Sequence, residues 1–307
     1  MNIYTVGETL LDIIFKGVEP QTAKPGGSAF NASVTLGRLG APINFISETG
    51  QDKVGDLILD FMNENGVEAN FISRYPLGHT AIALAFLNDK SDAEYEFYKD
   101  YPAQRLEVEF PEFQKDDLLM FGSFYALNPG IRPRVKELLE KADRAGATIM
   151  YDPNFRSSHL PERDNLVPVI KENLGYATLV RASDEDLLNI FDVDNPDAAW
   201  EKIAPLSDVL IYTANAEGVY LRSPSLSFHM EVERIEPLST IGAGDTFNAG
   251  LLYGIWKKGY GREQIKLLDK SQWEEIIVTA IQFSREVCLS YDNYLPQGYA
   301  NHYKQDN

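Results

Sequence analysis

Short runs of apolar residues alternate with segments of helical periodicity along most of the chain. A continuous apolar run of this length is typical of a strand that is covered on both faces of a sheet. A helical pattern such as that of residues 132–146 flanks each run. The alternation predicts an α/β fold with a doubly wound, mainly parallel sheet between helices. The predicted strands are 2–7, 42–50, 117–123, 147–152, 177–183 and 208–214.

Two helices are predicted close to the N-terminus. Residues 28–39 follow a Pro-Gly-Gly turn, and residues 53–65 end at an Asn-Gly pair that is typical of a helix C-terminus. The inward face of the first helix would carry Ala29, Ala32, Leu36 and Leu39. The inward face of the second would carry Val54, Leu57, Ile58 and Phe61.

Residues 12–27 and 80–101 interrupt this rhythm, because both segments have an extended pattern. In the second, the runs IALAF and EYEFY flank the turn-rich NDKSDA, which indicates a β-hairpin. We expect a single domain over residues 1–307 with a small β-strand lid formed by about 10–27 and 75–103. The pattern favours an edge hairpin without a function equally well.

Composition excludes several classes of protein. The chain of 307 residues has an ordinary globular composition and a formal net charge of −18, which disfavours nucleic acid and anionic lipid as partners. The N-terminus lacks a basic signal-peptide region, and no segment is long and apolar enough for a membrane span. We therefore expect a cytoplasmic protein without nucleic-acid or membrane partners.

A glycine-rich turn at 239–250, STIGAGDTFNAG, opens a helical run. Gly242 and Gly244 allow a close backbone approach, and the N–H groups at such a helix N-terminus suit phosphate oxygens. Asp245 in the first helical turn has two explanations from pattern alone, as a catalytic carboxylate or as a helix cap. The turn lacks the spacing and position of a dinucleotide-binding motif, so a nicotinamide-dependent oxidoreductase is disfavoured.

Several motifs in the same order resemble those of the ribokinase-like (PfkB) carbohydrate kinases, and the fructokinases among them most. That family begins its first helix with Gly-Gly-x-x-x-Asn and carries a D-T-x-G-A-G-D turn near its C-terminus. The matching segments are PGGSAFNASVTLGRLG (25–40), ETGQDKVGDLILDFMNENGV (48–67), YDPNFR (151–156), RASDEDL (181–187), YTANAEGVYL (212–221) and STIGAGDTFNAG (239–250).

The resemblance implies a ribokinase-like fold and transfer of the γ-phosphoryl group of ATP to a sugar hydroxyl. Phosphoryl transfer depends mainly on positioning and charge neutralisation. Asp245 would be the general base, and the backbone amides of Gly242, Ala243 and Gly244 would form the anion hole. The best substrate assignment is fructose, with 2-keto-3-deoxygluconate kinase and a non-catalytic sugar- or nucleotide-binding regulator as alternatives.

The resemblance also implies a sugar site and a nucleotide site. The segment at 95–101 departs from the fructokinase pattern, since a lysine replaces the usual arginine and loses its planar fork. The predicted sugar-binding residues are Asp12, Gly26, Gly27, Asn31, Tyr98, Lys99 and Arg156. The predicted nucleotide-binding residues are Thr213, Asn215, Gly218, Gly242 and Gly244.

The metal requirements follow from the same resemblance. Mg²⁺ would accompany ATP, with Asp186 reaching it through water, because Mg²⁺ retains part of its hydration shell. Ser239 replaces an aspartate that helps to hold a monovalent cation in relatives, which leaves potassium dependence open. Asn215 replaces a glycine, and we expect the turn to survive because asparagine tolerates the left-handed conformation. Lids of this type often pair between subunits, so a homodimer through the lid is a further expectation.

Overall fold

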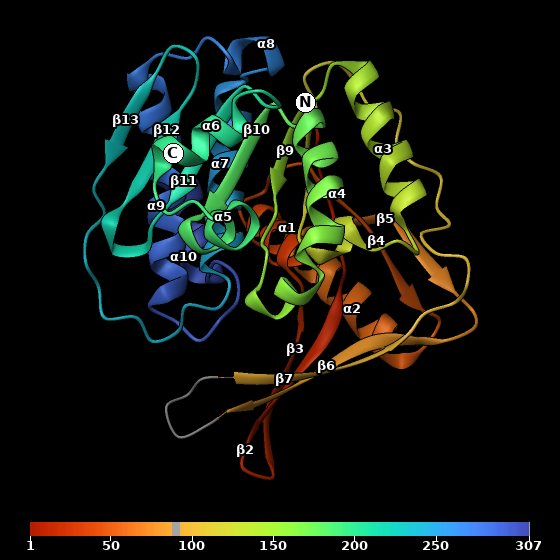
Figure 1. Ribbon diagram of the computed structural model, residues 1–307. Coiled ribbons are helices and arrows are strands. Elements are labelled where there is room, and N and C mark those ends of the chain that lie inside the picture. The colour runs from red at the N-terminus through yellow and green to blue at the C-terminus, as the bar shows by residue number, and fades with distance from the viewer. Residues whose placement is uncertain (88–92, 307) are drawn as a thin grey trace.

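The computed structural model describes residues 1–87 and 93–306, and its centre is a nine-stranded sheet in the order β13-β12-β11-β10-β9-β8-β1-β4-β5 (Figure 1). The strands from β11 to β5 pair in parallel, and β12 and β13 add an antiparallel edge. The predicted mainly parallel sheet is confirmed. Its strands are Ile3–Val6 (β1), Ile43–Gly50 (β4), Glu68–Tyr75 (β5), Leu118–Gly122 (β8), Thr148–Asp152 (β9), Leu179–Ser183 (β10), Val209–Thr213 (β11), Val219–Arg222 (β12) and Ser227–Met230 (β13).

A second sheet projects from one end of the body (Figure 1). It has the order β3-β2-β6-β7 and consists of Leu10–Lys16 (β2), Glu19–Gly26 (β3), His79–Leu87 (β6) and Ala93–Asp100 (β7). These strands fall within the predicted lid segments of about 10–27 and 75–103, and β6 and β7 pair antiparallel. The turn predicted between them lies at 88–92, outside the described residues. Only Gly7, Glu8 and Thr9 link β1 to β2, so the small sheet starts at the carboxyl edge of the large one.

Helices cover both faces of the large sheet, as a parallel sheet requires. One core is shared with α1, α2, α7, α8, α9 and α10, and the other with α3, α4, α5 and α6. The α-helices are Ser28–Arg38 (α1), Lys53–Glu64 (α2), Arg132–Ala145 (α3), Arg163–Tyr176 (α4), Asp184–Phe191 (α5), Pro196–Ile203 (α6), Ala243–Lys258 (α7), Arg262–Ile265 (α8), Lys270–Cys288 (α9) and Gln297–Asp306 (α10). Short 3₁₀ turns lie at Phe124–Leu127, Ser157–Glu162 and Asn215–Glu217.

The two helices predicted near the N-terminus form, with one error in their inward faces. All four residues expected to face inward in the first helix are buried. In α2, however, Leu57 is 43% exposed, whereas Ile58 and Met62 are fully buried. Ile58 and Met62 are one turn apart and face the core, which turns the neighbouring Leu57 towards solvent.

The helices α7 and α9 pack closely because a glycine of α7 faces the backbone of α9. A Cβ atom added to Gly250 would overlap the backbone of Ala280. Gly250 itself is buried within α7, at a point where the helix has no room for a side chain. Small residues at a crossing allow the axes to approach and extend the apolar contact.

We expect Gly250→Ala to destabilise the protein by about 1–3 kcal/mol, because a methyl group forced into a packed contact displaces backbone. Gly175→Ala is the matched control: it also lies in a helix, and nothing lies within 4 Å of the added Cβ. That control should be neutral or stabilising by up to about 1 kcal/mol. Urea unfolding measures both, and equal effects of the two variants would contradict this account of the α7–α9 contact.

Candidate functional site

The carboxyl ends of the central parallel strands bring polar side chains to one edge of the large sheet. Asp152 ends β9 and Thr213 ends β11, while Arg181 lies between them on β10. Side chains alternate along a strand, so these three share a face with the buried Met150, Leu179 and Ile211. That face is covered by α1 and α7. Ligands of open α/β folds bind at this edge.

Asp245, in the first turn of α7, lies against the start of α1. Its Oδ1 accepts a hydrogen bond from Ser28 Oγ at 2.6 Å, and its Oδ2 accepts one from Asn31 Nδ2 at 2.8 Å. Burial raises the pKa of Asp245 to about 6, although the bonds from Ser28 and Asn31 lower it; the charge of Asp152 raises it further and that of Arg156 lowers it. The structure therefore joins the two glycine-rich segments around one carboxylate.

The backbone before Asp245 forms the predicted helix N-terminus. Gly242 caps α7 in the left-handed region with φ of 80°, and a Cβ there would overlap the carbonyl of Asn293. The Ala243 N–H donates to the carbonyl of Thr240 at 3.3 Å. The first N–H groups of a helix have no partner within it. Gly244 and Asp245 thus present their N–H groups most freely at this end of α7.

Asp12 and Gly26 lie side by side on β2 and β3 of the small sheet, close to the start of α1. A Cβ on Gly26 would overlap the carboxylate of Asp12. Gly27, with φ of 124°, is the N-cap of α1 and faces the carbonyl of Glu8. Burial raises the pKa of Asp12 to about 7. A half-buried carboxylate and two glycines therefore lie beside the start of α1.

The two predicted residues of β7 lie on different sides of the small sheet. Tyr98 pairs with Ile82, is 57% exposed and donates its hydroxyl to Glu96 at 3.2 Å. Lys99 lies over the ring of Phe97 and bonds Glu8 Oε2 at 2.8 Å. The structure does not bring Tyr98 to the face that carries Asp12.

Tyr95 and Phe97 are the aromatic residues of β7 that lie on the same face as Asp12. Asp12 pairs with Ala83 and Tyr95 with Ala85, two positions further on along β6. Burial raises the pKa of Tyr95, the charge of Asp12 raises it further and that of Arg156 lowers it. Sequence reasoning missed Tyr95; the alternation of EYEFYKD with Asp12 would have indicated it once the strand register was known.

Arg156 follows β9 and is exposed at the start of the 3₁₀ turn. Its charge lowers the pKa values of both Asp245 and Tyr95, so it lies near both groups. The neighbouring Asp152 is buried and accepts hydrogen bonds from Asn248 Nδ2 at 2.5 Å and from Arg181 Nη1 at 3.1 Å. Asp152, Arg181, Asn248 and Ser28 were missed as single site residues, since their contacts depend on tertiary packing.

The predicted nucleotide-binding residues follow β11. Thr213 accepts a hydrogen bond from Arg181 Nη2 at 2.8 Å. Asn215 has φ of 45°, which confirms that asparagine takes the left-handed conformation of this turn. Gly218 has φ of 103°, and a Cβ there would overlap the carbonyl of Met230. Asn215 is exposed, whereas Gly218 is buried.

Asp186 is buried at the start of α5, where it completes a capping box with Ser183. Its Oδ1 accepts the Phe155 N–H at 2.6 Å, and its Oδ2 accepts the Ser183 N–H at 2.8 Å and hydroxyl at 2.6 Å. Within the described residues no cluster of three His, Cys, Asp or Glu side chains is suited to hold a metal ion directly. Only Oδ1 of Asp186 keeps a lone pair for a further donor such as water.

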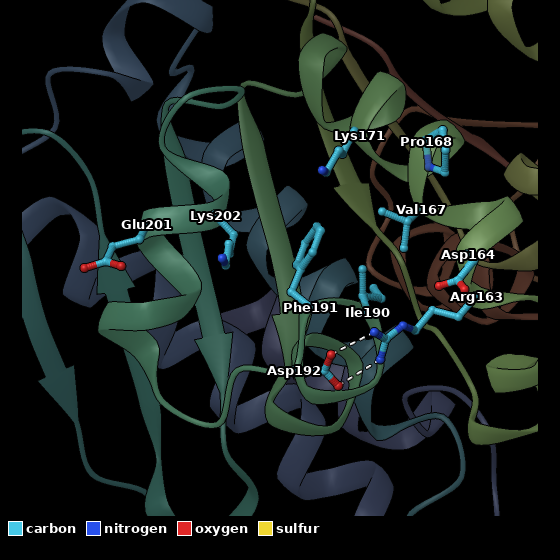
Figure 2. A pocket seen from close by; sticks show the side chains of 10 residues that line it. All are labelled: Arg163, Asp164, Val167, Pro168, Lys171, Ile190, Phe191, Asp192, Glu201 and Lys202. Atoms are coloured by element: carbon cyan, nitrogen blue, oxygen red, sulfur yellow. Dashed lines mark hydrogen bonds and ion pairs between the residues drawn. The ribbon is translucent and has the colours of Figure 1, made fainter.

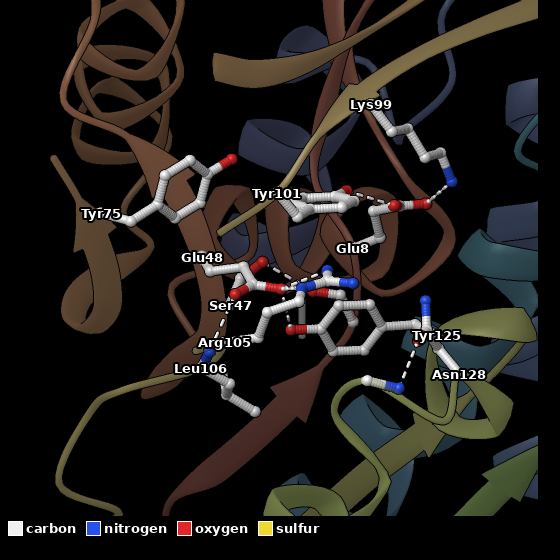
Figure 3. A network of polar contacts seen from close by, with 12 residues as sticks. Glu8, Ser47, Glu48, Tyr75, Lys99, Tyr101, Arg105, Leu106, Tyr125 and Asn128 are labelled. Atoms are coloured by element: carbon white, nitrogen blue, oxygen red, sulfur yellow. Dashed lines mark hydrogen bonds and ion pairs between the residues drawn. The ribbon is translucent and has the colours of Figure 1, made fainter. Parts of the chain in front are cut away.

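A buried polar network anchors the small sheet to the body (Figure 3). Glu48, near the end of β4, accepts hydrogen bonds from Arg105 Nε at 2.8 Å and from the Leu106 N–H at 2.8 Å. Glu8 accepts hydrogen bonds from the Tyr101 hydroxyl and from Lys99. The Arg105 guanidinium lies 3.5 Å from the Tyr101 ring centroid and so couples the two carboxylates. The chain segments entering and leaving the small sheet are held together here.

A cavity of about 450 Å³ lies elsewhere, among α4, α5 and α6 (Figure 2). Its rim includes the pair Arg163–Asp192, with Nη2 and Oδ2 separated by 2.7 Å. None of the predicted site residues lines it. The carboxyl edge of the sheet, with its convergent polar groups, is therefore the better candidate site.

Comparison with known proteins agrees with this geometry. The profile of the pfkB family carbohydrate kinases matches residues 2–268. The chain belongs to this family. It is accordingly an ATP-dependent carbohydrate kinase, an enzyme that transfers a phosphoryl group to a sugar. Within the described residues no helix combines the length and apolar character needed to cross a bilayer.

Relatives of this pfkB family member include fructokinases. The chain is 27% identical to a fructokinase of Vibrio alginolyticus over 253 residues, covering 81% of this chain and 82% of that protein. It is 25% identical over 258 residues to the aminoimidazole riboside kinase of Salmonella typhimurium, covering 82% and 80%. The substrate class within the family is therefore not fixed by identity alone.

Solved structures establish the ribokinase-like fold. A double mutant of fructokinase from Vibrio cholerae, with fructose, ADP and potassium ion bound, has a TM-score of 0.84 at 20% identity and covers 98% of this chain and 97% of its own. An aminoimidazole riboside kinase from Salmonella enterica, in complex with aminoimidazole riboside and an ATP analogue, has a TM-score of 0.82 at 21% identity, covering 99% and 100%.

The raised pKa values of Asp245 and Asp12 predict a stability effect that can be measured. Between about pH 4 and the raised pKa the folded state binds more protons than the unfolded state, so stability falls as pH rises through that window. Asp245→Asn and Asp12→Asn remove this penalty. We expect each variant to gain about 1–3 kcal/mol on the wild type between pH 4 and pH 7.5 in urea unfolding.

Asp52→Asn is the control of opposite sign. Burial raises the pKa of Asp52, but hydrogen bonds from Thr80 and Gly55 outweigh it and hold the pKa below its ordinary value. This variant should lose stability relative to the wild type as pH rises. Asp245→Asn and Asp52→Asn changing in the same direction would contradict the assignment.

Proposed function

We propose that this carbohydrate kinase phosphorylates fructose to a fructose phosphate, with Asp245 as the general base. The observation that carries the proposal is the Asp245 carboxylate at the N-terminus of α7, held by Ser28 and Asn31 of α1. A partly desolvated carboxylate with a pKa of about 6 is mostly ionised at pH 7 and yet basic enough to accept a hydroxyl proton. A helix cap needs neither this burial nor these two partners.

The chemistry follows from the neighbouring groups. Asp245 would accept the proton of the attacking sugar hydroxyl as its oxygen bonds to the γ-phosphorus. The helix-end amides of Gly242, Ala243 and Gly244 would stabilise the negative charge on the transferring phosphoryl group. Gly244 carries most of this role, since Ala243 already donates to Thr240.

The sugar would lie between α1 and the small sheet. We assign its hydroxyl contacts to Asp12, Asn31 and the backbone at Gly26 and Gly27. A carboxylate accepts hydrogen bonds from the hydroxyl groups of a polyol, and an amide both accepts and donates them. Arg156 would approach from β9. Tyr95 is a better candidate from β7 than Tyr98, because it lies on the face of Asp12.

Fructose is favoured over 2-keto-3-deoxygluconate by the state of Lys99. The carboxylate of an acidic sugar would have to compete with Glu8 for the ammonium of Lys99, since the two are paired at 2.8 Å. Among the predicted sugar-binding residues only Arg156 would then remain as its charge partner. The similarity to the Vibrio alginolyticus fructokinase points in the same direction. A non-catalytic regulator is the further alternative, and the retained Asp245 with its two partners argues against it.

The nucleotide would bind along Thr213, Asn215 and Gly218, with its terminal phosphate at Gly242 and Gly244. Mg²⁺ bound with ATP would neutralise phosphate charge during transfer. The residues fit a hydrated ion better than a direct protein cage, because Asp186 already accepts three hydrogen bonds and keeps only one Oδ1 lone pair. Ser239 leaves potassium dependence to be measured.

The test is release of ADP with Mg-ATP against fructose, ribose, 2-keto-3-deoxygluconate, glucose and aminoimidazole riboside. We expect the highest kcat/KM with fructose, and at least a hundredfold lower turnover for Asp245→Asn. The pH profile of kcat/KM should fall below about pH 6 as Asp245 is protonated. Each assay is run with and without potassium, which measures the dependence of turnover on this ion.

Asp269→Asn is the control, since Asp269 caps α9 in the same way that a simple N-cap would at α7. It should leave turnover unchanged. Near-wild-type turnover of Asp245→Asn would show that Asp245 is not the base. A strong preference for 2-keto-3-deoxygluconate would show that this sugar, and not fructose, is the substrate.

We also propose a homodimer through the outer face of the small sheet. The strand register places Ile13, Phe15, Leu84, Phe86 and Tyr98 on the face opposite Asp12. Phe86 and Tyr98 are 38% and 57% exposed. Glu96, which pairs with Leu84, adds one charge to this otherwise apolar face, and an exposed apolar face is typical of a protein interface.

Light scattering should therefore give the mass of a dimer, and Phe86→Glu should convert it to a monomer, because the charge would be buried in the contact. Leu267→Glu, at a residue that is 82% exposed elsewhere, should leave the dimer intact. A monomeric wild type at micromolar concentration would disprove the interface.

A further inference from the structure

Arg181 occupies an unusual position beneath the N-terminus of α7. A Cβ placed on Gly244 would lie 3.0 Å from its Nη1 and 3.4 Å from its Nη2. Its Cζ lies 5.6 Å from the ring centroid of Phe247, further along the same helix. The guanidinium therefore lies against the first turn of α7, and the absence of a side chain at Gly244 gives it room.

This arrangement places like charges together. The N-terminus of a helix carries a partial positive charge, so a cation beside it is unfavourable unless an anion is also present. The side chain of Arg181 is only 11% exposed, so water screens the repulsion poorly. Asp152 offsets part of the charge at 3.1 Å, but it also accepts a hydrogen bond from Asn248.

Arg181 also has donors to spare. A guanidinium has five N–H groups. One bonds Asp152 through Nη1 and one bonds Thr213 through Nη2. Nε is buried and has no hydrogen-bond partner within residues 1–87 and 93–306. A buried donor without a partner is costly, and such local conflicts are typical of functional sites.

We propose that Arg181 is a catalytic residue that binds the terminal phosphoryl group of ATP. The anion would lie between the guanidinium and the N–H groups of α7 and relieve the conflict between the two positive groups. Asp152, near Asp245, and Thr213, on the predicted nucleotide side, each hold one of the two Nη atoms of the guanidinium. This inference rests on the proposed phosphoryl-transfer site and adds a side-chain cation to its backbone amides.

In the transfer step, the sugar oxygen forms a bond to the γ-phosphorus while its proton passes to Asp245. The bond between the γ-phosphorus and the bridging oxygen breaks, and its electron pair leaves with ADP. Arg181 remains protonated throughout and stabilises the negative charge on the phosphoryl oxygens. Its role is electrostatic.

The experiment compares Arg181→Gln with Arg222→Gln. Arg222 is a matched control, because its side chain is 10% exposed and its Nε lies 2.7 Å from Asp197, away from α7. Calorimetry would measure the binding of AMP, ADP and a non-hydrolysable ATP analogue, and steady-state assays would measure kcat. We expect Arg181→Gln to weaken the ATP analogue at least about tenfold relative to AMP, and to lower kcat about 10²- to 10³-fold. Arg222→Gln should change neither.

A purely structural role would give a different result. If Arg181 only held Asp152 in place, a folded Arg181→Gln variant would bind each of the three nucleotides with the affinity of the wild type. That result would overturn the proposal. Arg181→Lys keeps the charge but loses the fork, so intermediate affinity for the ATP analogue supports the proposal should the glutamine variant not fold. Wild-type affinity in that lysine variant, together with wild-type kcat, overturns it.

The nucleotide measurements also separate this inference from the proposed function. Wild-type protein that turns over none of the five sugars would overturn the assigned function, while the loss of ATP-analogue affinity in Arg181→Gln would still support the phosphate contact. Turnover of fructose with unchanged kcat in Arg181→Gln would leave the function standing and remove Arg181 from the site.

Discussion

The contact between the starts of α1 and α7 is the constraint around which the site forms. Asp245 and its partners Ser28 and Asn31 are separated by more than two hundred positions in the sequence, yet they share two hydrogen bonds. The contact requires the parallel sheet to bring both helices to one face. It also requires the close packing of α7 on α9, which fixes the position of α7. Burial of the Asp245 carboxylate destabilises the folded protein. A functional role for this carboxylate would explain why it is nevertheless kept there.

The same constraint explains the glycines of both segments. Gly27 and Gly242 adopt backbone conformations that L side chains rarely take, and a Cβ atom on either would overlap a carbonyl oxygen. Gly26 and Gly244 are different: their backbone is ordinary, but a charged side chain occupies the space in front of each, Asp12 in one case and Arg181 in the other. Two glycines therefore shape the turns, and two make room for charges at the site.

The order of strands and helices could be predicted from the sequence, because continuous apolar runs and helical periodicity depend on local patterns. Asn215 is another local success, since its left-handed turn depends on the residue itself. The choice of Tyr98 over Tyr95 depended instead on strand register, which shifts every side chain of β7 between the two faces of the small sheet. The wrong prediction that Leu57 faces inward has a similar cause, because its exposure depends on the rotation of α2 about its axis. Arg181 could not be selected from sequence, because only the fold brings it close to Gly244, which lies more than sixty positions further along the chain.

The roles proposed for Arg181 and Asp152 would reconcile a net charge of −18 with a phosphate site. The long-range field of the protein repels anions, so binding depends on a short-range arrangement in which positive groups are dry and fixed. The end of α7 and the guanidinium supply two such groups, while Asp152 limits their repulsion before the nucleotide binds. A stronger neutralisation by Asp152 would remove the attraction for phosphate, and a weaker one would leave a buried cation unpaired. Asn248 shares the Asp152 carboxylate, so in the proposed site it would weaken the neutralisation of Arg181 by Asp152.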